Sequence, residues 1–132
     1  MTQPDTPDEP AAPVRLRARL RLQAGADIHL GPGRVDLLEG IAQTGSIAEA
    51  GRRLGMSYQR AWSLVKAMNE AFSTPLVDKQ RGGHAGGGAA LTELGAAVLQ
   101  AYRLAEQAAE RAAAPHLRVA LTALAPVDNS RQ

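Results

Sequence analysis

Hydrophobic and polar residues are spaced differently in successive parts of the chain, and each change of spacing predicts a different element. Over residues 14–22 apolar side chains alternate with arginine, and this period of two indicates a half-buried β-strand. Gly31-Pro32-Gly33 then interrupts the chain. Helical spacing follows and predicts a first helix over about 34–43, ended by Gly45. Its apolar face consists of Val35, Leu38, Ile41 and Ala42.

Two further helices follow, each opened by a serine in the position of a helix cap. Ser46-Ile47-Ala48-Glu49 is a capping box, in which the serine hydroxyl accepts a hydrogen bond and the glutamate reaches back. It predicts a short second helix that ends near Leu54, with a turn at Gly55. Ser57 is a second cap and opens a third helix over about 57–72. The core positions of this helix are Ala61, Leu64 or Val65, Met68 and Phe72.

A hairpin and a long helix complete the pattern. Pro75 blocks continuation of the third helix, and Leu76-Val77 begins a short strand. A glycine-dense tip and a return strand over 89–91 have the pattern of a β-hairpin. A last helix, capped by Thr92, is predicted over about 92–114, and Pro115 stops it.

This order of elements predicts a fold that is mainly α with a small β component: a winged helix-turn-helix with a long C-terminal helix. Residues 1–13 contain four prolines and are expected to form a disordered tail. Residues 14–115 form the domain, and residues 116–132 form an extension that either adds a short strand or stays loose. Only four residues are aromatic, so the core must be aliphatic and alanine-rich, which favours helices.

The charge of the chain is compatible with a polyanionic partner. The net charge is +2, but Asp5, Asp8 and Glu9 in the predicted tail are not balanced by any basic residue there. Without the tail, 15 basic residues stand against 10 acidic ones. An excess of this size fits binding to nucleic acid without requiring it.

Several classes of function are not expected from this sequence. The chain has no cysteine, which removes thiolate nucleophiles and cysteine-ligated zinc and fits a cytoplasmic protein. His29, His84 and His116 are far apart in sequence, so we expect no metal site. No nucleophile–base pair or carboxylate pair stands out, so neither enzyme activity nor a cofactor is expected. No apolar run approaches the roughly 20 residues of a membrane span, and no secretory signal is evident.

The third helix has an outward face suited to reading DNA. Its apolar side can anchor it while its polar side enters a major groove about 12 Å wide. Glutamine pairs with adenine and arginine with guanine, and serine near a helix start can meet phosphates. The predicted wing, residues 79–88, adds basic groups around bare glycine backbone. The predicted DNA-binding residues are Ser46, Ser57, Tyr58, Gln59, Arg60, Ser63, Lys66, Lys79, Arg81 and His84. The alternatives are a plain solvated helix face and a flexible hairpin tip.

Two other features have both a structural and a functional interpretation. Trp62, the sole tryptophan, lies between the buried and outward faces of the third helix. We expect it to pack within the protein, with contact to the DNA backbone as the alternative. The arginines of residues 14–22 are expected to be a solvated face that protects an edge strand, with binding of phosphate or a partner as the alternative.

Residues from Leu30 to about Tyr102 resemble the N-terminal winged-helix domain of the ModE-type molybdate-responsive regulators. The resemblance rests on Gly-Met-Ser-Tyr at 55–58 with Ala61-Trp62, and on the glycine-rich wing ending in Leu91-Thr92. LysR-type regulators share part of this pattern but lack that wing. The resemblance implies a homodimer, held largely by the first strand region and the long last helix, on a palindromic operator.

A seam of mostly small side chains along the last helix fits such a dimer, although it could equally pack within one chain. The predicted dimer residues are Leu94, Val98, Ala101, Ala105, Ala108 and Ala112. Full-length relatives continue into molybdate-binding domains, and too few residues follow Pro115 to form one, so no molybdate site is carried over.

The sequence therefore predicts a cytoplasmic, sequence-specific DNA-binding transcriptional regulator, and the resemblance implies a link to molybdenum metabolism. Whether a small-molecule effector acts on the protein stays open. The alternatives are a winged-helix adaptor that binds another protein, and a protein that binds an oxyanion such as molybdate.

Overall fold

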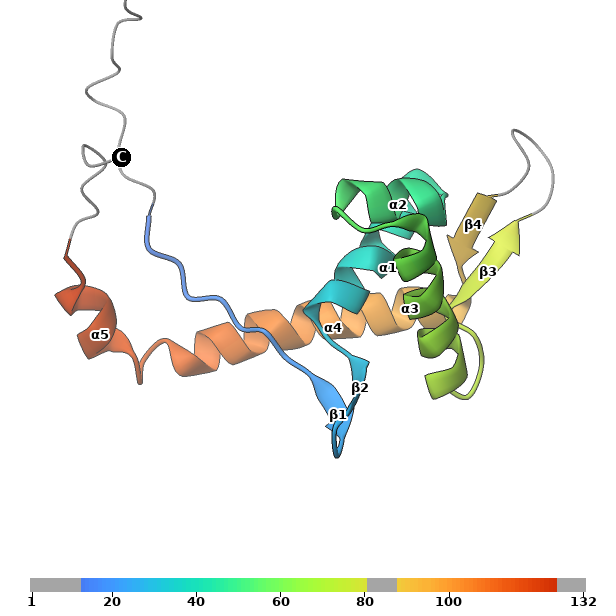
Figure 1. Cartoon of the computed structure of the whole chain (residues 1–132). Helices are drawn as coiled ribbons and strands as arrows, with labels where there is room; N and C mark the ends of the chain where they lie inside the picture. Colours follow the sequence, from blue (N-terminus) through green and yellow to red (C-terminus); the bar gives the residue numbers. More distant parts are fainter. Residues whose placement is uncertain (1–12, 81–87, 126–132) are drawn as a thin grey trace, which may run out of the picture.

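The computed structural model describes residues 13–80 and 88–125. A hairpin precedes three helices, a second hairpin, a long helix and a short final helix (Figure 1). The elements are β1 (Leu22–Ala24), β2 (Asp27–Leu30), α1 (Pro32–Thr44), α2 (Ile47–Arg53), α3 (Tyr58–Ala71), β3 (Val77–Gln80), β4 (Gly88–Leu91), α4 (Glu93–Ala113) and α5 (Arg118–Ala123). This order confirms the predicted fold class, a mainly α protein built as a winged helix-turn-helix.

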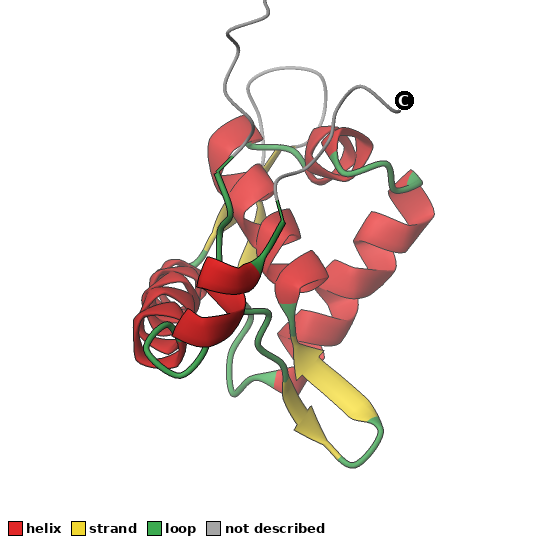
Figure 2. Ribbon diagram, turned by 90° about the vertical axis from the view of Figure 1, so that its left-hand side faces the viewer, coloured by secondary structure: helices red, strands yellow, loops and turns green. Residues whose placement is uncertain are grey.

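The core lies around α1, which touches α2, α3, α4 and β4. We call α1–α3 with the β3–β4 hairpin the head. The β1–β2 hairpin projects from the helical body, whereas β3 and β4 pair antiparallel behind it (Figure 2). Four side chains of α1 are fully buried: Val35, Leu37, Leu38 and Ile41. Ala42, predicted to be in the core, is exposed, because periodicity identifies a face of a helix but not how far the covering elements extend along it.

Close contacts between small residues bring the first three helices together. A Cβ added at Gly40 would lie 2.9 Å from the Cβ of Ala50, and one at Gly51 would lie 2.8 Å from the Cβ of Ala61. These two glycines therefore allow α1, α2 and α3 to cross at short range. Gly55 has open space around it and forms the predicted turn, with a φ of 73°.

The predicted helix caps are present, with one exception in their detail. The hydroxyls of Ser46, Ser57 and Thr92 accept backbone hydrogen bonds at the starts of α2, α3 and α4. Glu49 does not reach back to the amide of Ser46 as the capping box predicts. That amide donates to the hydroxyl of Thr44 at 3.1 Å, and Glu49 pairs instead with Arg52. Arg52, one turn further along α2, competes for the Glu49 carboxylate, and this explains why Glu49 does not reach back to the Ser46 amide.

The strand predicted over 14–22 is not formed, but the predicted alternation of half-buried and exposed side chains is present. Residues 13–21, which we call the arm, form an extended segment that crosses α4 without pairing with a strand (Figure 1). Leu16, Ala18 and Leu20 are half-buried, and the four arginines between and beside them are exposed. A period of two describes any extended chain lying on a surface, so it could not distinguish a helix surface from a sheet.

The C-terminal extension is also different from what the sequence predicts. Residues 116–132 were expected to form a strand or stay loose, and α5 occupies part of them. Pro115 ends α4, and the alanine and leucine residues after the turn favour a new helix. The predicted tail before Pro13 lies outside the described residues.

Candidate nucleic-acid interface

The third helix exposes a polar face and buries the opposite one. Gln59, Arg60, Ser63 and Lys66 are all exposed, and their spacing places them on one side of α3. Ala61, Val65 and Met68 are at most 2% exposed on the other side. The choice that the sequence left open between Leu64 and Val65 is thus decided for Val65, since Leu64 is only half-buried. Phe72, which was also predicted to be in the core, is only half-buried as well. The helix is anchored in the core while its polar face is free to meet a partner.

The start of α3 offers backbone amides to an anion. The Ser57 hydroxyl accepts from the amide of Arg60 at 3.1 Å, and Ser57 and Tyr58 are both exposed. The positive end of the helix dipole lies here, next to the exposed face of the helix. Ser46 is placed differently, because it is half-buried and its hydroxyl is occupied in capping α2 at 3.0 Å from the Glu49 amide.

Two exposed arginines at the end of α2 add positive charge beside the turn, and sequence reasoning did not single them out. Arg52 and Arg53 both lie near Glu49, with side chains 75% and 57% exposed. The hydrogen bond from Arg52 holds the pKa of the Glu49 carboxyl below its ordinary value, so the carboxylate stays ionised. The sequence signal that could have identified these residues is a pair of adjacent arginines close to Gly55, the glycine of the turn.

Hydrogen bonds from the Asn69 side chain and from the end of α1 hold the backbone at the base of the β3–β4 hairpin. Asn69 of α3 accepts from the amides of Leu76 and Val77 at 2.8 and 3.1 Å and donates to the Val77 carbonyl at 3.1 Å. On the other strand, the Ala89 amide donates to the carbonyl of Gly45 at 2.9 Å. Asn69 was not predicted as a functional residue. The only signal is that asparagine inside a helix tends to bond to a neighbouring backbone.

Lys79 of β3, a predicted DNA-binding residue, lies against Trp62 of α3. The Lys79 ammonium is 4.5 Å from the centre of the indole ring, a cation–π distance. Trp62 is half-buried, so it packs within the protein as expected and also faces the wing. Lys79 is exposed beyond it and extends the basic surface of α3. Arg81 and His84, the other predicted wing residues, lie outside the described residues.

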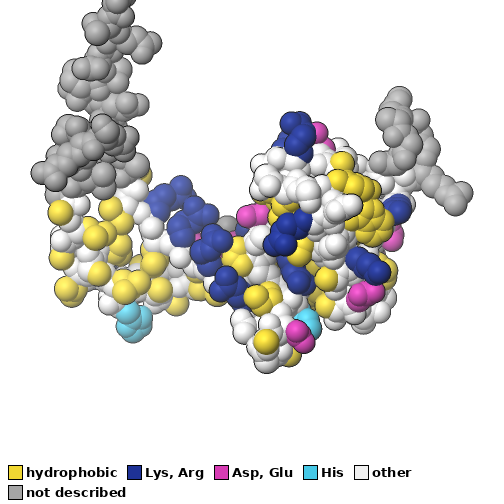
Figure 3. Space-filling model, viewed as in Figure 1, with side chains coloured by type: hydrophobic (Ala, Val, Ile, Leu, Met, Phe, Trp, Pro, Cys, Tyr) yellow, Lys and Arg dark blue, Asp and Glu magenta, His cyan; other side chains and the backbone are white. Residues whose placement is uncertain are grey.

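The predicted dimer seam on α4 divides into two parts. Leu94 and Val98 are half-buried against the core of their own chain. Ala101, Ala105, Ala108 and Ala112 are exposed on the half of α4 that extends beyond the head (Figure 1). Large apolar side chains are exposed around the same region, among them Leu104 at 55%, Val119 at 80% and Leu124 at 56%. Apolar surface is continuous over α5 and the neighbouring end of α4, whereas basic side chains follow the arm (Figure 3).

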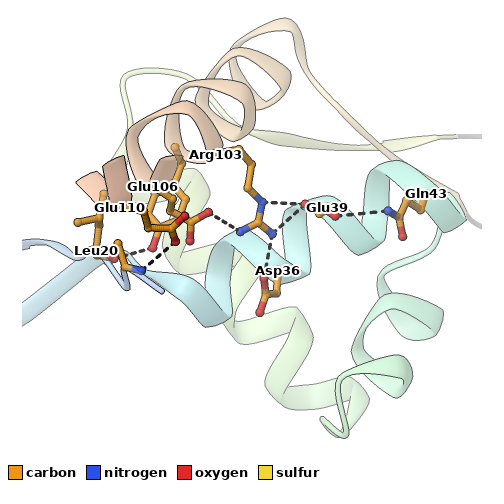
Figure 4. Close-up of polar contacts among 9 residues, drawn as sticks. Leu20, Asp36, Glu39, Gln43, Arg103, Glu106 and Glu110 are labelled. Atoms are coloured by element: carbon orange, nitrogen blue, oxygen red, sulfur yellow. Dashed lines mark hydrogen bonds and ion pairs between the residues drawn. The ribbon is translucent and has the colours of Figure 1, made fainter. Parts of the chain in front are cut away.

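A network of polar contacts joins α1, α4 and the arm (Figure 4). Arg103 of α4 donates to Asp36 and Glu39 of α1 and to Glu106 of its own helix, at 2.9, 2.8 and 3.0 Å. Burial acts against the charge of Arg103, but hydrogen bonds to Asp36, Glu106 and Glu39 outweigh it and raise the pKa further above its ordinary value. The guanidinium is therefore permanently charged.

Two hydrogen bonds hold the arm against α4. The Tyr102 hydroxyl donates to the Leu20 carbonyl at 2.6 Å, and the Ala18 amide donates to the Glu110 carboxylate at 2.9 Å. Burial of Tyr102, and then the negative charge of Glu106, raise the pKa of the phenol. None of these contacts was predicted, because each joins residues far apart in the sequence.

In the described part of the chain, no group of histidine, aspartate and glutamate side chains could hold a metal ion. In residues 13–80 and 88–125, no helix combines the length and apolar character needed to cross a membrane.

Comparison with known proteins shows which proteins the head resembles. Residues 33–96 match the family described as "Bacterial regulatory helix-turn-helix protein, lysR family". The chain is 42% identical over 97 residues to the molybdenum-pterin-binding protein MopA of Rhodobacter capsulatus, which covers 74% of this chain and 37% of MopA. It is 37% identical over 101 residues to the DNA-binding transcriptional dual regulator ModE of Escherichia coli, which covers 76% of this chain and 37% of ModE. The chain thus spans about a third of the length of these relatives.

A solved structure supports the same fold. The protein in "Crystal structure of CbnR_DBD-DNA complex" superimposes with a TM-score of 0.52, over 67% of this chain and 95% of that one. The two sequences are 23% identical in this match, so the likeness concerns the fold alone.

Proposed function

We propose that this chain is a sequence-specific DNA-binding transcriptional regulator. The premise is its match to the LysR-type helix-turn-helix family and its similarity to the N-terminal part of the ModE regulators. The observation that carries the proposal is the division of α3 into a buried apolar face and an exposed face of Gln59, Arg60, Ser63 and Lys66. A helix held in this way can enter the major groove with side chains that hydrogen-bond to base edges.

The wing and the helix starts would position the protein on the DNA backbone. Lys79 lies beside the exposed face of α3, and the start of α3 presents backbone amides and the hydroxyls of Ser57 and Tyr58. Such groups bind phosphates and carry little sequence information themselves. We assign base reading to α3 and backbone contact to the wing and the start of α3, with Arg81 and His84 as further candidates on the wing. Ser46 contributes by capping α2.

We further propose that two copies bind a palindromic operator as a homodimer. The exposed alanines of α4 and the apolar side chains around Leu104 and Val119 form a surface that a second copy would cover. The residues proposed for the contact are Ala101, Ala105, Ala108 and Ala112, with Leu94 and Val98 supporting the helix from within the chain. A two-fold dimer would read half-sites separated by one helical turn of DNA or a multiple of it.

The relatives connect this proposal with molybdenum, since they include a molybdenum-pterin-binding protein and a molybdenum transport protein. We propose that the genes under control belong to molybdenum metabolism. On this proposal the protein works in the cytoplasm, where its DNA is, and needs neither enzyme activity nor a cofactor.

Selection from a pool of random duplexes, followed by sequencing of the bound fraction at several salt concentrations, tests the function. We expect a palindrome to be enriched and the affinity to fall steeply as salt rises, because bound phosphates release counterions. Binding without enrichment by folded protein would overturn sequence-specific reading and leave the adaptor function. Equilibrium dialysis with molybdate tests the oxyanion alternative, and tight binding of molybdate would favour that alternative.

A further inference from the structure

The long helix α4 is secured to the head along only part of its length. Its buried residues are Gly95 and Tyr102, and beyond this point the helix extends away from the head towards α5 (Figure 1). The exposed alanines proposed for the dimer contact begin at this departure point. Whatever fixes the direction of α4 here also fixes where a second head would lie relative to the first.

Arg103 occupies this departure point and is bonded across it. Its Nη2 donates to Asp36 at 2.9 Å and its Nε donates to Glu39 at 2.8 Å, so one side chain holds two positions one turn apart on α1. Its Nη1 donates to Glu106 on its own helix at 3.0 Å. The guanidinium is planar and its donors point in fixed directions, so these bonds restrict the angle between α1 and α4 as well as their distance (Figure 4).

Arg103 is the guanidinium that hydrogen-bonds to three carboxylates at this contact, and Arg15 and Arg17 of the arm line the same surface. Asp36 and Glu39 on α1 face Glu106 on α4, and the arginine lies between them. If the guanidinium were removed, carboxylates of like charge would face each other across the two helices. The helices would then be pushed apart rather than simply released.

We infer that Arg103 is a positioning residue that sets the angle between α4 and the head, and thereby the separation between the two recognition helices of a dimer. This inference rests on the proposed homodimeric DNA reader. It assigns the spacing of operator half-sites to a residue far from the DNA. Base preference within each half-site belongs to α3 and is independent of Arg103.

The separation can be measured without DNA. The chain has no cysteine, so Ala71→Cys, at the exposed end of α3, gives one spin label per chain and one distance per dimer. In this background we compare Arg103→Met and Arg103→Lys with Arg111→Met, an exposed arginine on the same helix that loses the same charge. Pulsed electron spin resonance gives the distance distribution, and light scattering gives the oligomeric state.

We expect a narrow distance distribution for the parent and for Arg111→Met, and a broader distribution with a shifted mean distance for Arg103→Met. Arg103→Lys keeps the charge but loses the planar set of donors, so it should broaden the distribution without shifting it as far. Selection from random duplexes should then show that Arg103→Met keeps the half-site sequence and loses the preference for one spacing.

Identical distances and identical spacing in Arg103→Met and the parent would overturn the inference. A monomeric parent protein would overturn both this inference and the proposed homodimer. A dimer that enriches no palindrome would contradict the proposed function alone, because the spin-label distances would still report on Arg103. Circular dichroism checks that each variant folds, and if Arg103→Met does not, the same two measurements on Arg103→Lys decide.

Discussion

Gly95 lies where the first turn of α4 passes the chain that leads into the wing. A Cβ at this position would lie 2.0 Å from the carbonyl oxygen of Leu76, which is backbone and cannot rotate away. The contact brings the start of α4 against the start of the wing, so two elements depend on the absence of one methyl group.

We predict that Gly95→Ala destabilises the protein by about 1–3 kcal/mol, because the head must shift to admit the methyl group. Gly33→Ala is the matched control. Gly33 is exposed in α1 and has no atom within 4 Å of the added Cβ, so alanine there should be neutral or stabilise by up to about 1 kcal/mol. Urea unfolding of both variants measures the difference, and equal effects would contradict the contact.

Arg60 is the exposed residue of α3 best suited to two hydrogen bonds with a guanine. We predict that Arg60→Ala weakens binding to the selected operator by about 1–3 kcal/mol and relaxes the preference at one base pair. Glu70→Ala, at an exposed position near the other end of α3, should leave the preference unchanged. Competition binding against single-base operator variants is the measurement, and an unaltered preference would remove Arg60 from the base-reading residues.

At the scale of elements, the wing is a two-stranded hairpin whose position depends on α3. Asn69 makes three hydrogen bonds to the segment where β3 begins, so the start of β3 is held against α3. The Lys79–Trp62 contact joins the same two elements nearer the wing tip. A two-stranded hairpin is only marginally stable alone in water, and these two contacts hold this one in a fixed direction relative to α3.

We predict that Asn69→Ala costs about 1–3 kcal/mol of stability, because it leaves two backbone amides and a carbonyl without their partner. Operator binding should weaken as well, and hydroxyl-radical protection should be lost mainly where the wing lies on the DNA. Comparison with Glu70→Ala, the exposed neighbour, separates this effect from a general change in α3. Full protection by Asn69→Ala at saturating protein would refute the role given to Asn69.

Elements defined by neighbouring residues could be predicted from the sequence, and contacts between distant residues could not. The caps at Ser46, Ser57 and Thr92 are local events within four residues, and all three were predicted. Arg103 meets Asp36 and Glu39 across separations of 67 and 64 residues, and its sequence neighbours give no sign of these partners. The arm shows the same limit, since its alternation was recognised but the helix beneath it was not.

The candidate site divides in the same way. The exposed face of α3 follows from helical spacing alone, so its four polar residues could be named from the sequence. The pairing of Lys79 with Trp62 and the support from Asn69 depend on how β3 returns over α3. That path is set by the tertiary packing of Leu76 and Val77, which no local pattern encodes.

At the scale of the whole molecule, the exposed half of α4 and α5 give the protein an elongated shape with an apolar end (Figure 3). We predict that Ala105→Glu converts the dimer to a monomer, because it places a charge in the middle of the proposed contact. Gln107→Glu adds the same charge on an exposed neighbouring position and serves as the control. Light scattering over a concentration series distinguishes them, and a monomeric parent or a dimeric Ala105→Glu would contradict the proposed seam.

The arm should detach at high pH. Tyr102 is 5% exposed, and its raised pKa means that the phenol ionises more readily in the unfolded chain, near the ordinary value of 10, than in the folded protein. The stability that its neutral form contributes is complete below pH 10 and is lost as the pH rises through the higher folded pKa.

Tyr102→Phe should therefore be less stable than the parent at neutral pH, by about 0.5–1.5 kcal/mol for the lost hydrogen bond, and the difference should close above about pH 10. Tyr58→Phe is the control, because Tyr58 is 53% exposed. Thermal unfolding across this range measures the gap, and a constant gap would show that the Tyr102–Leu20 bond is not what titrates.

The attachment of the arm also orders events during synthesis of the chain. Its two hydrogen bonds reach residues 82 and 92 positions later, whereas the head contains all of its own helices and both wing strands by Leu91. A ribosome adds about 5–20 residues per second, so the head leaves the ribosome before Tyr102 and Glu110 do and can begin to fold without them. The arginine-bearing segment, which precedes the head in the chain, is then among the last segments to attach.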